Sequence, residues 1–281
     1  MPRKKLKYTK ARIKELRKQI DIYNATTILK RHDNLDLGRF YSRIDEEDPN
    51  NWKKSATTLD GVISKGEPYD KWLGNAKSYE DACEYRDLKA HQGTVTHALI
   101  DELVLGFQID LSQGWKMDGK YGEYIEYLPN RINKMVMSFV AFWNEKEPIA
   151  IASELQCFHD DIDYCGTADL FCIMNDKLCL VDYKTGGQYK SHELQLTQYK
   201  LVWDKIFPDF PIDELYCLYL KDGWRLKPGY SLKKWKFVPT IVNSANKIWS
   251  WYHGKNGKKP IPKQRKEYPN VFKIERSLTD E

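Results

Sequence analysis

The sequence predicts a mixed α/β fold, an αβββαβ core in which a mixed central sheet is flanked by helices. The first observation is a pair of short apolar runs, 168–174 and 178–184, separated by three polar residues, which is typical of a β-hairpin. The second is the helical spacing of apolar residues before the hairpin, at 131–145, and after it, at 191–207. With 281 residues, of which 41% are hydrophobic and 30% charged, the chain can form one sizeable core.

Residues that break helices or turn the chain bound the elements of this core. Pro148 ends the first helix, and the apolar run after it is predicted to be the first strand. Thr185-Gly186-Gly187 allows a sharp turn into the second helix, for which Ser191 is the candidate N-cap, and Pro208 ends that helix. In chain order, the predicted elements are a helix at 131–145, strands at 149–158, 168–174 and 178–184, a helix at 191–207 and a strand at 214–220.

The segments outside the core are basic or polar. The first eighteen residues contain nine Lys or Arg and one acidic residue, and a partial apolar stripe predicts an amphipathic helix. Such a helix could track a nucleic-acid backbone, or its charges could form a solvated face. Residues 32–54 are polar and rich in turn formers, so they are predicted to be a connection. The apolar stripe of the N-terminal helix consists of Leu6, Ile13, Leu16 and Ile20. The chain is predicted to divide into a basic N-terminal helical extension and connection at 1–54, a core domain at 55–253 and a basic tail at 254–281.

The predicted hairpin brings together side chains that suit a metal ion. If Asn175 and Asp176 form a two-residue turn, Asp169 lies opposite Asp182, and Lys184 shares a face with Asp182. Two carboxylates at about 5 Å repel each other unless a cation offsets their charge. Mg²⁺ is bound by one or two carboxylates with waters and phosphates, and the lysine could then orient or deprotonate a metal-bound water. The alternative is an Asp–Lys–Asp salt-bridge cluster on a solvated sheet face.

Four motifs follow one another in the sequence: G-T-V-T-H, then G-x-x-D, then D-Y-K-T-G after twelve residues, and finally Q-x-x-x-Y. In this order they resemble the motifs of the RecB-like branch of the PD-(D/E)xK nuclease superfamily, which includes phage and mitochondrial-type exonucleases. The resemblance covers about residues 55–225 and implies a restriction-endonuclease-like fold with Mg²⁺- or Mn²⁺-dependent nuclease activity. The matched segments are 93–97, 166–169, 182–186 and 195–199.

The resemblance also implies roles for single residues. Asp169 and Asp182 would hold the metal ion, together with the main-chain carbonyl of Tyr183. Glu154 would add a ligand, and His97 would lie near a second metal ion or the scissile phosphate. From the residues alone, Glu154 stays open, because a slip of one residue in strand register moves it to the other face. His97 stays open as well, because a lone histidine on a helix is more often structural.

Two further pairs of residues are candidates for substrate binding. Gln195 and Tyr199 are at i and i+4, so they share a helix face and could position Lys184 or a phosphate. The alternative is a capped amphipathic helix with one buried tyrosine. Ser55 and Thr57 lie in a segment that resembles one near the start of proteins of this branch, and their hydroxyls are candidates for phosphate contacts. Capping of the following helix is the alternative for this pair.

These observations predict a metal-dependent deoxyribonuclease, an exonuclease of DNA recombination, repair or replication. The alternatives are a structure-selective or restriction-type endonuclease of the same superfamily and a non-catalytic DNA-binding module. The predicted substrate is DNA, single-stranded or with free ends. No G-x-x-x-x-G-K-[ST] motif occurs, so unwinding would need a separate helicase. A recombinase or a single-strand-binding protein is a further candidate partner.

Cysteine usage and charge complete the expectations. Only Cys217 follows Tyr199, whereas members of the branch with an iron–sulfur cluster carry three cysteines near the C-terminus, so no cluster is predicted. The six cysteines show no disulfide-framework spacing, and the N-terminal stretch has no apolar secretory segment. No apolar run is long enough to span a bilayer, and a net charge of +5 is compatible with a polyanionic partner. We therefore expect an intracellular protein, in the cytoplasm of a bacterium or a phage-infected cell, with no membrane partner.

Overall fold

The computed structural model describes residues 6–34, 37–48, 51–111 and 128–253. In these ranges eight strands form a mixed sheet in the order β1-β2-β3-β5-β6-β7-β8, and β4 pairs with β5 outside this path. The strands are β1 (Leu29–Asn34), β2 (Gly38–Arg43), β3 (Lys53–Ser55), β4 (Ile149–Cys157), β5 (Tyr164–Met174), β6 (Lys177–Lys184), β7 (Glu214–Leu220) and β8 (Tyr230–Trp235). The helices are α1 (Lys10–Thr26), α2 (Ala56–Asp60), α3 (Glu67–Gly74), α4 (Tyr79–Val104), α5 (Leu128–Lys146), α6 (Ser191–Ile206) and α7 (Pro239–His253).

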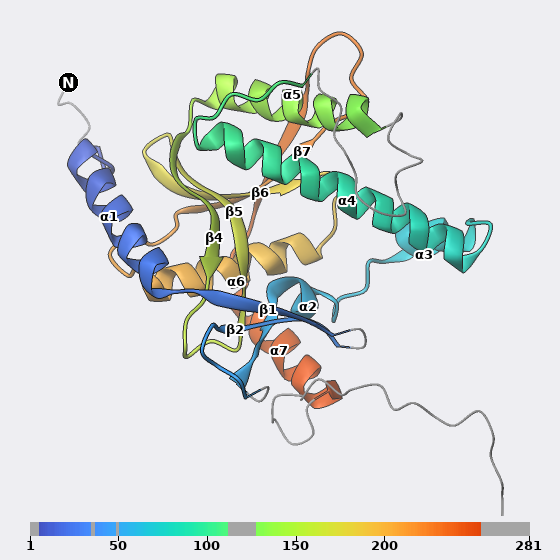
Figure 1. The fold of residues 1–281 in the computed structure, drawn as a ribbon, viewed down its shortest axis with the longest axis horizontal. Helices are drawn as coiled ribbons and strands as arrows, with labels where there is room; N and C mark the ends of the chain where they lie inside the picture. Colours follow the sequence, from blue (N-terminus) through green and yellow to red (C-terminus); the bar gives the residue numbers. More distant parts are fainter. Residues whose placement is uncertain (1–5, 35–36, 49–50, 112–127, 254–281) are drawn as a thin grey trace, which may run out of the picture.

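The sheet separates two hydrophobic cores. One core contains apolar residues of α1, α6 and α7, such as Leu16, Trp203 and Trp249. The other contains residues of α4 and α5, such as Ile100 and Phe139. Figure 1 shows α4 and α5 on one side of the strands and α6 on the other. Because both faces are covered, nearly all residues of β5 and β6 are buried. The predicted αβββαβ order is confirmed, as α5, β4, β5, β6, α6 and β7.

The central hairpin has the predicted register. Met174 pairs with Lys177, and the ladder runs back to Leu170 opposite Val181. Asn175 and Asp176 have positive φ values of 51° and 60°, as a two-residue type I′ turn requires. The next position along both strands places Asp169 beside Asp182.

The predicted connection at 32–54 is wrong, because it contains most of three strands. β1 pairs with β2, β2 with β3, and β3 runs parallel to β5, so the sheet continues across residue 54. Pairing at the edge of a sheet leaves most side chains of β1 exposed, and the segment therefore lacks the apolar alternation that predicts a strand.

The start of α6 also differs from the prediction. Ser191 is the first residue of the helix, and Lys190 takes the N-cap position without a side-chain hydrogen bond. The turn begins one residue earlier than expected because the N–H of His192 already donates to the carbonyl of Tyr189 (3.2 Å). Glu193 lies in the first turn, where its negative charge interacts favourably with the positive end of the helix dipole.

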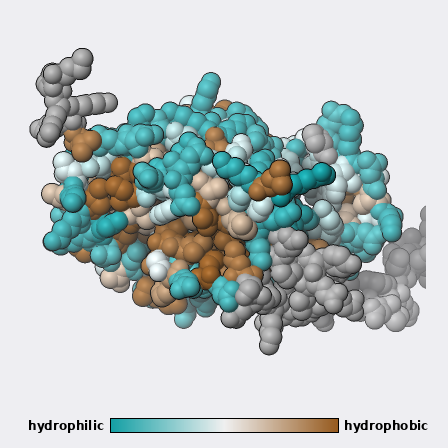
Figure 2. Space-filling view, turned by 90° about the horizontal axis from the view of Figure 1, so that it is seen from above, coloured by the Kyte–Doolittle hydropathy of each residue, from teal (hydrophilic) through white to brown (hydrophobic). Residues whose placement is uncertain are grey.

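The surface around the core is mainly hydrophilic, with local apolar areas. Figure 2 views the molecule from above and shows one such area among hydrophilic residues. On α5, the exposed large apolar side chains are Met137 and Val140. In the part of the chain that the structure describes, no helix is both long and apolar enough to cross a membrane. The predicted basic tail at 254–281 lies outside the described residues.

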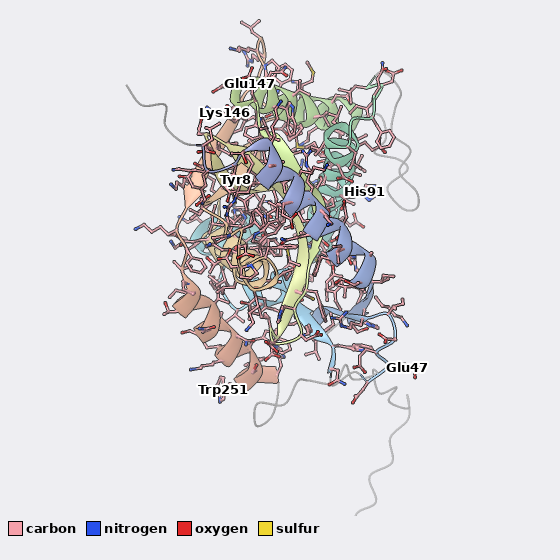
Figure 3. All side chains as sticks on the ribbon, turned by 90° about the vertical axis from the view of Figure 1, so that its left-hand side faces the viewer. Tyr8, Glu47, His91, Lys146, Glu147 and Trp251 are labelled. Atoms are coloured by element: carbon pink, nitrogen blue, oxygen red, sulfur yellow. The ribbon has the colours of Figure 1, made fainter. Side chains whose placement is uncertain are left out.

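The predicted N-terminal helix is present as α1. Ile13, Leu16 and Ile20 are buried against the sheet, whereas Leu6 lies before the helix and is exposed. The helix begins at Lys10, where the hydroxyl of Thr9 accepts the N–H of Arg12 (3.3 Å). Figure 3, seen from the side of α1, shows the helix lying across the strands, with α7 and Trp251 at the lower end of the view.

Candidate metal centre and its pocket

A pocket of about 850 Å³ opens beside the part of β5 at which its strand partners change. β5 pairs with β6 from Leu170 to Met174 and with β3 at Tyr164 and Cys165, and the residues from Gly166 to Asp169 pair with neither. The pocket is lined by residues of α4, β4, β5 and α6 and of the β1–β2 hairpin. Nine of the ten predicted site residues line it, and the tenth, Asp182, does not.

Three groups in this pocket lie at metal-ligand spacing. Ligand atoms of His97, Glu154 and Asp169 all lie within 4.8 Å of one another. His97 comes from α4, and its Nδ1 is 3.3 Å from Oδ1 of Asp169 on β5. Glu154 on β4 stands between Ser153, which pairs with Leu170, and Leu155, which pairs with Ala168. Its position is therefore the one opposite Asp169, which sequence reasoning had left open.

The backbone at Glu154 is strained. Its φ is 48°, in the left-handed region that non-glycine residues adopt at a cost of about 1–3 kcal/mol. The regular pairs on both sides of Glu154 hold it there. Strain of this kind in the middle of a paired strand is a feature of functional sites, and it is an observation that no sequence pattern predicted.

The electrostatics of these three groups follow from burial and proximity. Burial raises the pKa of Glu154 to about 7, and the neighbouring Asp169 adds to the rise. Burial would also raise the pKa of Asp169, but His97 and Lys184 outweigh it and hold that pKa below its usual value. Burial opposes the charged form of His97, yet the adjacent Asp169 raises the pKa of the imidazole. Asp169 is therefore ionised, and its second oxygen accepts the N–H of Tyr183 (2.5 Å).

Lys184 is held on the α6 side of the pocket. Its ammonium forms an ion pair with Asp182, and Nζ donates to Oε1 of Gln195 (2.7 Å). Nε2 of Gln195 donates in turn to the hydroxyl of Tyr199 (3.2 Å). Burial lowers the pKa of Lys184, but Asp182 outweighs it and raises that pKa above its usual value. The lysine is therefore a fixed cation.

Asp182 thus contacts the lysine and is not one of the three residues at metal-ligand spacing. It is 2% exposed, and burial raises the pKa of its carboxyl to about 6 while Lys184 opposes the rise. Asp182 and Lys184 are two residues apart on β6 and share the face that α6 covers. Tyr183, between them, directs its ring to the opposite core, with its centroid 5.6 Å from that of His97.

Two glycines of the matched motifs permit close packing around the pocket. A Cβ at Gly166 would lie 2.9 Å from Cε1 of Tyr199, so a side chain there would displace α6. A Cβ at Gly93 would lie 3.0 Å from Oγ1 of Thr185. The first glycine sets the distance between β5 and Tyr199, and the second sets the distance between α4 and the end of β6.

Ser55 is the N-cap of α2, as the capping alternative predicted. Its hydroxyl accepts the N–H of Thr58 (3.0 Å) and lies 2.9 Å from the hydroxyl of Thr57. Ser55 is buried, and Thr57 is exposed and lines the pocket. A phosphate contact from this pair stays a prediction.

Sequence reasoning missed several residues of the pocket. Asp101 lies one helical turn after His97 on α4, and its buried Oδ1 has no hydrogen-bond partner among the described residues. The i, i+4 spacing of His97 and Asp101 was the available signal. Arg31 and Arg39 also line the pocket. Arg39 lies in the segment 32–54 that had been interpreted as a connection, and Arg31 directly precedes it.

The side chains present fit a divalent cation. An imidazole and two carboxylates form a mixed nitrogen and oxygen donor set, which Mg²⁺, Mn²⁺ and related ions accept. The buried Oδ1 of Asp101 is a further acceptor without a partner among the described side chains. Acidic side chains outnumber the one imidazole in this group, and their carboxylates would attract a bound cation.

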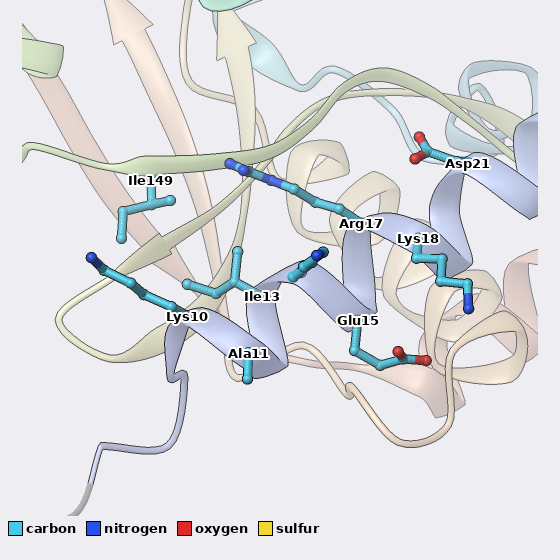
Figure 4. A pocket seen from close by; sticks show the side chains of 9 residues that line it. Lys10, Ala11, Ile13, Glu15, Arg17, Lys18, Asp21 and Ile149 are labelled. Atoms are coloured by element: carbon cyan, nitrogen blue, oxygen red, sulfur yellow. The ribbon is translucent and has the colours of Figure 1, made fainter.

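A second pocket, of about 770 Å³, lies on α1 and shares no lining residue with the first. Figure 4 shows Lys10, Arg17 and Lys18 projecting from the helix around it, with Ile149 of β4 opposite. Arg17 donates to the carbonyl of Ala150 (2.5 Å) and so helps to fix α1 to β4. Whether the other charges of α1 track a nucleic acid stays a prediction.

No protein-family model matches the chain, and no curated protein matches it. Among solved structures, the chain is similar to LHK-Exo in complex with dAMP, with a TM-score of 0.38, and to the alkaline exonuclease LHK-Exo from Laribacter hongkongensis, with a TM-score of 0.35. In both comparisons the sequence identity is 10%, and the alignment covers 72% of this chain and 87% of the LHK-Exo chain. Both TM-scores are too low to support an argument about function.

Proposed function

We propose that the chain is a metal-dependent deoxyribonuclease that hydrolyses phosphodiester bonds, and that it acts as an exonuclease. The observation that carries the proposal is the convergence of His97, Glu154 and Asp169 in one pocket with the partly buried ammonium of Lys184. A histidine and two acids beside a fixed lysine offer both a metal site and a positive charge for a phosphate. The motif resemblance supports the same activity and favours the exonuclease.

His97, Glu154 and Asp169 would hold Mg²⁺ or Mn²⁺, with Asp101 beside them. The resemblance also implies Asp182 and the carbonyl of Tyr183 as ligands, whereas the ion pair of Asp182 with Lys184 favours a role for Asp182 in holding the lysine. A bound ion would lower the pKa of a water molecule and offset the charge of the phosphate.

Lys184 has the role of an electrostatic group in this proposal. Since its pKa is raised, it keeps its proton and stabilises the negative charge that builds on the phosphate oxygens. Gln195 fixes the direction of the ammonium, and Tyr199 fixes the amide of Gln195. The exposed hydroxyl of Thr57 is available for a phosphate of the strand.

The proposed setting is DNA recombination, repair or replication inside a bacterium or a phage-infected cell. The proposed substrate is DNA that is single-stranded or has free ends. A separate helicase, recombinase or single-strand-binding protein is a proposed partner.

End-labelled linear DNA and covalently closed circles, each incubated with Mg²⁺, Mn²⁺ or EDTA, test the proposal. We expect loss of the linear strands in either metal, none in EDTA and intact circles. Lys184→Ala should abolish cleavage and leave DNA binding in place. Lys205→Ala, which removes a half-exposed lysine at the other end of α6, should cleave as the wild type does.

Each other outcome has a defined meaning. Cutting of closed circles would identify an endonuclease, and DNA binding without any cleavage would identify a non-catalytic module. Cleavage in EDTA, or by the Lys184→Ala variant, would contradict the proposed chemistry.

A further inference from the structure

The β1–β2 hairpin presents an ordered group of polar side chains to the pocket. Arg31 pairs with Tyr41 across the two strands, and Asp33 pairs with Arg39. Paired residues of an antiparallel ladder share a face, and so do residues two apart along a strand. The four side chains therefore stand on one face of the hairpin. Arg31, Arg39 and Tyr41 line the same pocket as the candidate metal centre.

Two guanidinium groups in this patch share one carboxylate. Arg31 donates to both oxygens of Asp33 at 3.0–3.1 Å, and Nε of Arg39 lies 3.5 Å from Oδ1 of Asp33. The side chains of Arg31 and Arg39 are 51% and 40% exposed. Five N–H donors on each arginine exceed what one carboxylate can accept, so the patch keeps both an excess positive charge and donors to spare.

The hairpin is anchored to the rest of the site. The N–H of Arg39 donates to Oγ1 of Thr58 (2.9 Å), and the same hydroxyl donates to the carbonyl of Arg39 (3.0 Å). Gly38 has a φ of +95°, and a Cβ there would lie 2.7 Å from the hydroxyl of Thr58. Thr58 belongs to α2, whose N-cap Ser55 lines the pocket. The backbone that carries Arg39 is thus fixed relative to the candidate metal centre.

We propose that Arg31 and Arg39 bind the phosphodiester backbone of the DNA strand that enters the pocket, and that Asp33 is the internal counterion that the phosphate displaces. This inference rests on the proposed function and adds a strand-binding element to it. Arginine is suited to the role because its planar fork matches phosphate oxygens. The arginines are half-exposed at the rim while Asp169 is buried in the pocket, so one strand can contact both.

The inference is tested by binding alone. The fluorescence anisotropy of a dye-labelled single-stranded oligonucleotide is measured in EDTA at several salt concentrations. The slope of log K against log salt is negative, and each lost phosphate contact lowers its magnitude by about 0.7 for a single strand, so Arg31→Gln/Arg39→Gln should lower the magnitude by about 1.4. Asp33→Asn should act in the opposite direction and bind at least about threefold more tightly, because it removes the competing carboxylate with all cations in place.

Arg43→Gln is the matched control. Arg43 lies on β2, on the same face as Tyr41, is 39% exposed and is paired with Asp160 at 2.8 Å, but it lines another pocket. Its slope should equal that of the wild type. Three results would each overturn the inference. They are a salt slope that changes as much in Arg43→Gln as in the double variant, an unchanged slope in the double variant, and weaker DNA binding by Asp33→Asn. Thermal unfolding of every variant checks the fold.

Two further arms separate the remaining possibilities. The double variant should lose the same affinity for strands with a 5′-phosphate and with a 5′-hydroxyl. A loss confined to the 5′-phosphate would overturn the assignment to the backbone. Because the assay contains no metal, a failure to cleave DNA would reject the proposed function and leave these binding results intact. Retained cleavage with unaltered binding by the variants would reject the inference alone.

Discussion

The two sides of the pocket carry different charge balances. On the side of α4 and β4, one imidazole faces Glu154 and Asp169, and Asp101, whose buried Oδ1 has no hydrogen-bond partner within the described ranges, lines the same pocket. On the side of α6, Lys184 has both an ionic partner, Asp182, and an amide acceptor. Burial is the largest cause of the raised pKa of both Glu154 and Asp182. The next cause differs: Asp169 raises the pKa of Glu154 further, whereas Lys184 lowers the pKa of Asp182. The first side therefore offers acidic groups to an added cation, whereas the second side already holds the ammonium of Lys184.

The largest effect should come from the first side. Asp169→Asn removes a carboxylate that contacts His97 and accepts the N–H of Tyr183. We expect Mn²⁺ binding to be lost and cleavage of linear DNA to fall by at least about 10²–10³-fold. Titration calorimetry with Mn²⁺ and the end-labelled strand assay measure the two quantities. Unchanged Mn²⁺ affinity would place the metal elsewhere.

Asp182→Asn tests the second side and should lower DNA cleavage without a matching loss of Mn²⁺ affinity. Its carboxylate holds Lys184, so cleavage should fall by about 10–10²-fold while Mn²⁺ affinity stays within a few-fold of the wild type. The buried lysine loses its ionic partner, and the variant should also be less stable by about 3 kcal/mol. If Mn²⁺ binding disappears as it does in Asp169→Asn, Asp182 is a direct ligand, as the resemblance implies, and the division of the pocket into two sides is wrong.

The same contrast between regions explains what the sequence could predict. The elements from α5 to β7 have buried apolar residues at the spacing of a helix or a strand, so their order and the hairpin register could be derived from the sequence. β1 has no buried residue among those described, and β2 is buried at Phe40, Tyr41 and Ser42, three neighbours that do not alternate. Neither strand therefore carries a periodic signal, and the two arginines of the hairpin were missed with them.

The candidate site was predictable where it depended on local spacing. Lys184 and Asp182 are two residues apart on one strand, and Gln195 and Tyr199 are one helical turn apart. The period of a strand or a helix therefore predicts that the two members of each pair share a face. The contact between His97 and Asp169 joins a helix to a strand across the sheet, and only the motif resemblance had linked them. The place of Glu154 depended on the length of the connection between β4 and β5, which sets the register of the two strands and which composition does not reveal.

Gly166→Ala tests how the two sides are joined. The added Cβ would lie 2.9 Å from the ring of Tyr199, the residue that orients Gln195. We expect a loss of about 1–3 kcal/mol in the free energy of unfolding, because the helix must shift to make room. Chemical denaturation measures it. Gly223→Ala, where a Cβ would meet nothing within 4 Å, is the control and should change stability by less than about 0.5 kcal/mol.

The carboxylate of Glu214, outside the pocket, gives the smallest effect and the clearest contrast with the candidate metal centre. Glu214 accepts from Lys177 (2.5 Å), Lys234 (2.7 Å) and the hydroxyl of Tyr216 (2.5 Å). Burial alone would raise the pKa of Glu214, but these hydrogen bonds outweigh it and lower that pKa to about 2. Its negative charge is fully offset by the protein, so this cluster needs no metal ion.

The pH dependence of stability follows from that lowered pKa. Because the carboxylate is favoured in the folded state, its contribution is complete above the usual pKa of 4.5 and is lost as the pH falls towards 2. Glu214→Gln should cost about 1–2 kcal/mol at pH 7, since both lysines are half-exposed and screened, and the difference from wild type should shrink below pH 4.5. Glu67→Gln, which removes an exposed pair with Lys71, should cost less than about 0.5 kcal/mol at any pH. Urea unfolding between pH 7 and pH 3, repeated with Mn²⁺, measures both, and a cost for Glu214→Gln that depends on the metal would mean that this cluster is coupled to the pocket.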